Sequence, residues 1–138
     1  MTRRIAMFVL IGLMVALPAY SSPLEGKTFV GEIAKKGEVK GDPDTFSFKS
    51  GKFHSTGCDP YGFTPSPYRV GKIGDSWTFA SESTSAKEGK MAWKGTIDGD
   101  SISGTAVWTK PGQAPIEYTF TGTRPPPEPA PPAAPAKP

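Results

Sequence analysis

The chain has 138 residues and a formal net charge of +3, from 16 Lys and Arg against 13 Asp and Glu. Two of the cations, Arg3 and Arg4, belong to an export signal, so 14 cations against 13 acids leave +1 on the remainder. The remaining lysines are scattered among the acids, which excludes the clustered basic face of a nucleic-acid-binding protein. The length predicts a single domain.

Residues 1–21 predict a secretory signal peptide. The segment has two arginines at its start, then the uncharged apolar run 5–17, and small-x-small residues just before a cut after Ser21. A membrane anchor is the alternative, but a span needs about 20 apolar residues. No Cys stands near the cut to carry a lipid. We therefore expect a periplasmic or secreted protein with no membrane span after cleavage.

Residues 22–124 predict an all-β domain, because apolar and polar residues alternate there between Gly, Pro, Asp and Ser. No stretch shows helical periodicity. The expected strands are 27–35, 44–50, 52–55, 68–73, 76–82, the two arms of a hairpin over 89–108 that turns at 98–100, and 116–122.

Each expected strand has one apolar face, which favours antiparallel pairing around a core. The inward residues are Phe29, Gly31, Ile33, Phe46, Phe48, Phe53, Tyr68, Val70, Trp77, Phe79, Met91, Trp93, Gly95, Ile97, Ile102, Gly104, Ala106, Trp108, Ile116, Tyr118 and Phe120. Eight strands without a long crossover predict an up-and-down meander, and closure into a barrel would remove its exposed edges. A two-sheet β-sandwich is the alternative.

The connections alternate in length. Those after the second, fourth and sixth strands are tight, whereas those after the first, third, fifth and seventh are longer. In an up-and-down meander the longer connections all lie at one end, and both chain ends leave from the other. Because binding residues concentrate on loops held by a rigid scaffold, we expect any binding site at the loop end.

Residues 125–138 hold eight of the 16 prolines and predict a disordered or polyproline II tail. Proline cannot donate to a sheet ladder, and Ala-Pro repeats have no side chains to bury. A solvated tail is the simplest interpretation. A ligand for a proline-recognising groove and a cell-wall spacer are the alternatives.

The longest connection, 56–67, holds the single Cys, Cys58, together with Tyr61 and Phe63, and the single His, His54, precedes it. One His and one Cys make at most half a metal site, so no metal is predicted and these two are weak candidates only. A Cys nucleophile needs an oriented base, and nothing in the spacing provides one. We expect Cys58 to be buried, with no catalytic residue and no cofactor.

The many aromatic residues allow two interpretations of the barrel interior. The rings favour a filled core, whereas Gly31, Gly95, Gly104 and Ala106 on the same faces leave room for a small apolar pocket. If a pocket exists, the expected ligand-binding residues are Tyr61, Phe63, Trp93, Trp108 and Tyr118.

The meander, with alternations such as those in 93–97 and 103–108, resembles a small calycin-type barrel, the class of lipocalins and avidins. The resemblance implies architecture only, because Gly26-Lys27-Thr28 stands where lipocalins carry Gly-x-Trp. Residues 51–58 together with 61–63 also resemble small exported bacterial β-barrel proteins of unassigned function.

Three functions follow as hypotheses. The first is binding of a small apolar or amphipathic ligand at the loop end. The second is a protein-interaction or inhibitor module that presents 56–67 to an envelope protein over a filled core. The third, an enzyme, would need His54, Cys58 and a carboxylate in one cleft, and we do not expect it.

Overall fold

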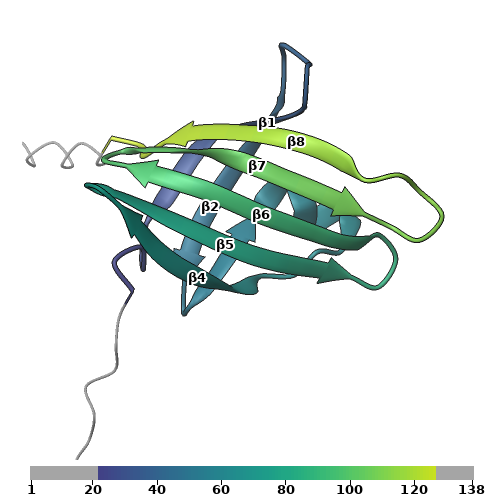
Figure 1. Ribbon diagram of the computed structural model, residues 1–138, viewed down its shortest axis with the longest axis horizontal. Coiled ribbons are helices and arrows are strands. Elements are labelled where there is room, and N and C mark those ends of the chain that lie inside the picture. Colours follow the sequence, from purple (N-terminus) through teal and green to yellow (C-terminus); the bar gives the residue numbers. More distant parts are fainter. Residues whose placement is uncertain (1–21, 127–138) are drawn as a thin grey trace, which may run out of the picture.

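Eight antiparallel strands follow one another in chain order around a closed barrel (Figure 1). The structure, a computed structural model, describes residues 22–126. Pairing of the first strand with the last closes the barrel, as in Ile33 opposite Phe120, and so confirms the predicted meander against the sandwich. The strands are β1 (Thr28–Lys35), β2 (Asp42–Lys49), β3 (Lys52–Ser55), β4 (Ser66–Ile73), β5 (Ser76–Ser85), β6 (Gly89–Asp98), β7 (Ser101–Thr109) and β8 (Ile116–Thr123).

Three strand ends differ from the sequence prediction by two residues or more. β2 and β4 each begin two residues earlier than expected, and β5 continues to Ser85. Pro43 and Pro67 suggested loops, yet each is the second residue of its strand, a place where a missing N–H interrupts little of the ladder. The predicted loop after β3 also contains a 3₁₀ helix, η1 (Thr56–Tyr61).

Aromatic rings fill the middle of the barrel. Phe46 lies 4.9 Å from Phe120, and Phe53 lies 4.9 Å from Phe79 and 5.0 Å from Trp93, measured between ring centroids. The inward glycines do not leave a void here, because a Cβ on Gly95 would stand 2.5 Å from the Phe79 ring. The glycines instead make the room that these rings occupy.

The segment before β1 closes the tight-turn end of the barrel. Leu24 is fully buried, and the Gly26 N–H donates to the Phe48 carbonyl at 2.7 Å. The Glu25 carboxylate accepts hydrogen bonds from the Gly51 N–H and the Tyr68 hydroxyl. This apolar plug was not part of the predicted core.

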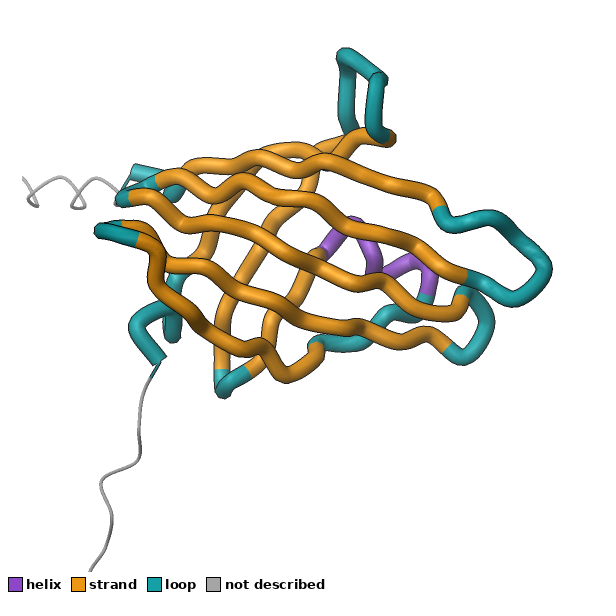
Figure 2. Tube along the Cα trace, viewed as in Figure 1, coloured by secondary structure: helices purple, strands orange, loops and turns teal. Residues whose placement is uncertain are grey.

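The longer connections and the two ends of the described chain lie at opposite ends of the barrel. In Figure 2 the β5–β6 and β7–β8 connections extend together on the right, and the tight β4–β5 and β6–β7 turns lie on the left. The Arg124 N–H donates to the carbonyl of Asp100 in the β6–β7 turn, which fixes the end of β8 there. The expected signal peptide, and all but two residues of the expected tail, lie outside the described residues.

Candidate functional site

A cavity of about 570 Å³ opens at the loop end of the barrel. Its walls come from the end of β1, the β1–β2 connection, the start of β2, η1, and the loop-end residues of β6, β7 and β8. Ring packing therefore fills the barrel only in part. The filled-core interpretation applies to the middle of the barrel, and the pocket interpretation applies to its loop end.

Four of the five predicted ligand-binding residues line this cavity: Tyr61, Phe63, Trp108 and Tyr118. Phe63 is buried, Trp108 and Tyr118 are half-buried, and Tyr61 is 60% exposed at the mouth. Residues distant in the chain are thus brought together around one space.

The lining rings do not pack on one another. Among the described residues, every close ring pair involves the core aromatics or Tyr68, and none involves these four. The indole N–H of Trp108 is already engaged, since it donates to the Glu88 carbonyl. Trp108 and Tyr118 pack against the hydrophobic core and also line the cavity, so an occupant would contact the surfaces of these rings that face the cavity.

The fifth predicted residue, Trp93, does not line the cavity. It is 1% exposed, it packs in the ring cluster, and its indole N–H donates to the Ser83 hydroxyl at 2.8 Å. Its side chain belongs to the core below the cavity floor.

A layer of buried polar side chains separates the ring core from the loop end, and sequence reasoning did not find it. Its members are Asp44, Ser55, Ser66, Ser81 and Ser83. Ser66 and Ser81 join β4 to β5 through their hydroxyls at 2.7 Å. In residues 22–126 no buried side-chain polar atom lacks a hydrogen-bond partner, so each of these five side chains has its hydrogen bonds satisfied.

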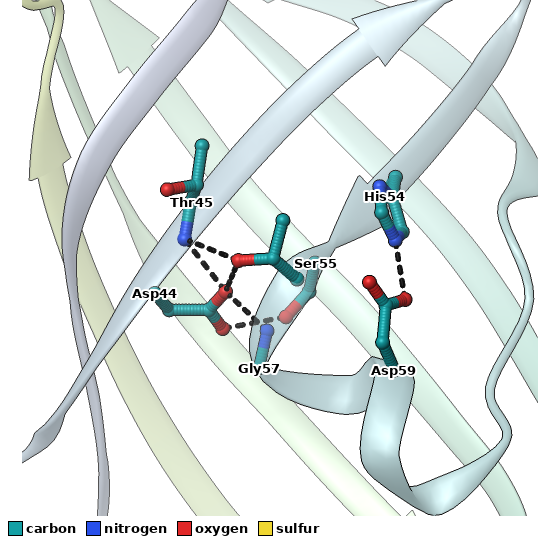
Figure 3. A network of polar contacts seen from close by, with 7 residues as sticks. Asp44, Thr45, His54, Ser55, Gly57 and Asp59 are labelled. Carbon is teal, nitrogen blue, oxygen red and sulfur yellow. Dashed lines mark hydrogen bonds and ion pairs between the residues drawn. The ribbon is translucent and has the colours of Figure 1, made fainter.

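Asp44 holds η1 against the barrel (Figure 3). Its carboxylate accepts hydrogen bonds from the Thr45 N–H at 2.7 Å, the Gly57 N–H at 2.8 Å and the Ser55 hydroxyl, and a longer one from Thr56. The side chain is 3% exposed. A carboxylate with these donors fixes where the helix, and hence Cys58 and Tyr61, stand at the cavity wall.

His54 and Cys58 do not converge. His54 points to Asp59, with 2.6 Å between its Nε2 and the nearer carboxylate oxygen (Figure 3). Burial raises the pKa of the Cys58 thiol to about 11, with a further increase from the nearby carboxylates of Asp44 and Asp59. The thiol therefore stays protonated at neutral pH. Over the part of the chain that the structure describes, no three His, Cys, Asp or Glu side chains form a metal-binding group.

A second hollow, of about 500 Å³, lies over β4–β7 beside Arg69 and Lys94. Three threonines and three glycines of the sheet form most of its remaining wall, and only Phe79 contributes a ring. It contains none of the predicted site residues. The loop-end cavity joins ring faces to polar groups, which is the usual composition of a small-molecule site, and we take it as the candidate site.

The fold and this cavity define a small closed antiparallel barrel whose architecture is compatible with that of calycin-like barrels. No protein-family model matches the chain, and comparisons with curated proteins and with solved structures find no significant match. No helix within residues 22–126 has the length and apolar character to cross a membrane.

Proposed function

We propose that this protein is an exported, calycin-like barrel that binds a small apolar or amphipathic molecule in its loop-end cavity. The observation that carries the proposal is the set of four aromatic side chains that surround about 570 Å³ without packing on one another. Buried aromatic surface is a strong source of binding energy, and a few polar groups then orient the ligand.

The site favours binding over catalysis. Cys58 is held as a neutral thiol, and His54 is paired with Asp59 outside the cavity lining. Asp44 is engaged by hydrogen-bond donors of its own strand and of η1. These contacts hold the cavity wall in place and do not form a nucleophile–base pair.

The proposal can be tested with N-phenyl-1-naphthylamine, a neutral apolar dye whose fluorescence rises in an apolar site. We expect residues 22–138 to bind the dye saturably. Tyr61→Ala should weaken binding by about fivefold, because an aromatic contact contributes on the order of 1 kcal/mol. Tyr61 is exposed, so its removal should leave the free energy of unfolding nearly unchanged.

Ile73→Ala is the matched control. Ile73 is 70% exposed, lies at the tight-turn end of β4, and is not part of the cavity wall. This substitution should leave dye binding unchanged. Absence of saturable binding, or an equal loss in both variants, would overturn the proposal.

The alternative is a protein-interaction or inhibitor module whose partner is an envelope protein. It is favoured by Val39, fully exposed in the β1–β2 connection, and by Tyr61 across the same cavity mouth. A chain that binds no dye and retains no small molecule in a native mass spectrum would support this alternative.

A further inference from the structure

The carboxylates around the loop-end cavity have no cationic partner. Glu38, Asp42 and Asp44 line the cavity, and within the described residues none of them takes part in an ion pair. Lys35 and Lys40 also line it, and both are exposed. Glu38 and Asp42 are exposed as well, so these four charges lie at the rim, where water screens them, and only Asp44 is buried.

Asp44 is the carboxylate that the protein buries most deeply. Its hydrogen bonds come from hydroxyl and backbone N–H donors, all of them neutral. Such donors offset part of the cost of burying a charge, but they leave its field uncompensated. A cation placed in the cavity would interact favourably with that field.

Two side chains of the cavity wall feel nearby carboxylates. Burial raises the pKa of Tyr118, and among the further causes the Glu38 carboxylate raises it as well. Asp44 and Asp59 act in the same direction on Cys58. Asp44 is buried whereas both lysines of the cavity wall are exposed, so the least screened charge of the wall is negative.

We infer that the loop-end cavity selects an organic cation with an apolar body. The cationic head would lie near Glu38 against the faces of Tyr61, Trp108 and Tyr118, since aromatic faces attract cations. The apolar body would lie against Phe63 and Met91, which are buried apolar residues of the wall. This inference rests on the proposed function and specifies the charge of the ligand.

Three competitors with the same octyl chain test the inference. Octyltrimethylammonium, octanol and octanoate are each used to displace N-phenyl-1-naphthylamine from residues 22–138. We expect the cation to bind about tenfold more tightly than octanol, as a partly desolvated cation–π contact predicts. Octanoate should bind more weakly than both.

Two charge-removing variants act in opposite directions. Glu38→Gln should weaken binding of octyltrimethylammonium severalfold, and Lys40→Gln should strengthen it by a similar factor. Both side chains are exposed and form no hydrogen bond or ion pair among residues 22–126, so each variant should fold normally. Ile73→Ala, which lies outside the cavity wall, should leave the binding of octyltrimethylammonium unchanged.

The failure of this inference differs from the failure of the proposed function. If the dye binds but octanol or octanoate competes as well as the cation, or the cation does not compete, the charge selection is wrong and the binding site stands. If the dye does not bind at all, the proposed function falls and this inference falls with it.

Discussion

Replacing Asp44 removes the acceptor that four donors share, and it tests whether this residue holds η1 on the barrel. In Asp44→Ala the Ser55 hydroxyl and the Gly57 N–H lose this acceptor. The Thr45 N–H keeps a second acceptor, the Thr56 hydroxyl, at 3.2 Å. One buried donor and one half-buried donor left unpaired cost about 1 to 3 kcal/mol each, so we expect a loss of about 3 kcal/mol.

Asp44→Asn should cost less. Its amide oxygen can accept from Gly57, and its amide group can donate to the rotated Ser55 hydroxyl, so the loss reduces to the charge assistance, about 1 kcal/mol. Asp42→Ala is the control, because Asp42 is exposed on the same strand and should change stability by less than about 0.5 kcal/mol.

Urea unfolding followed by tryptophan fluorescence gives these free energies. Hydrogen exchange at the Gly57 amide gives a local measure, and it should accelerate in Asp44→Ala relative to the strand amides. Equal losses in Asp44→Ala and Asp44→Asn, or an unchanged Gly57 exchange rate, would refute the view that this carboxylate positions η1.

Three further predictions concern packing and protonation. Gly31→Ala should prevent folding or lower the free energy of unfolding by more than about 3 kcal/mol, because its Cβ would stand 1.8 Å from the Thr121 carbonyl oxygen. In Gly71→Ala the Cβ meets only the movable hydroxyl of Thr78, so the loss of stability should be small. Soluble yield and thermal melting compare the two variants. Leu24→Ala should cost about 2 to 4 kcal/mol in urea unfolding, since Leu24 is fully buried in the plug; a cost below 1 kcal/mol would contradict that role. The pKa of Cys58 rises from 9.0 in the unfolded chain to about 11 on folding, so the folded state holds this proton more tightly and stability should fall as pH rises from 9 to 11. Cys58→Ala should remove that part of the pH dependence, and alkylation by iodoacetamide at pH 8 should be on the order of a hundredfold slower than for an ordinary thiol.

The alternation of side chains predicted the barrel because every strand turns an apolar face inward. The hairpin over 89–108 illustrates this, since Met91 stands opposite Trp108 and Trp93 opposite Ala106, as period-2 counting requires. The same counting turned Trp108 and Tyr118 inward, and the long connection 56–67 placed Tyr61 and Phe63 at the loop end, where the cavity is found.

The pattern was less informative where serine replaces an apolar residue. After Phe79 the inward positions of β5 are Ser81 and Ser83, and the expected strand ended early at Glu82 for that reason. Their burial depends on Ser66 and Trp93, which lie on other strands and satisfy their hydroxyls. Likewise, Asp44 was predicted only as the first residue of a strand, because three of its four donors come from residues 11 to 13 positions later.

The sequence by itself determined the strand order, the turns and the end that carries the loops, since these depend on local periodicity and connection length. It favoured the closed barrel, and the pairing of β1 with β8 confirms it. Only the tertiary structure decided which part of the interior is filled and which is open. The reason is volume: Phe79 and Phe120 occupy the room beside Gly95, while the rings at the loop end remain apart. Whether a buried polar group finds its donors is decided in the same way, by distant residues that folding brings together.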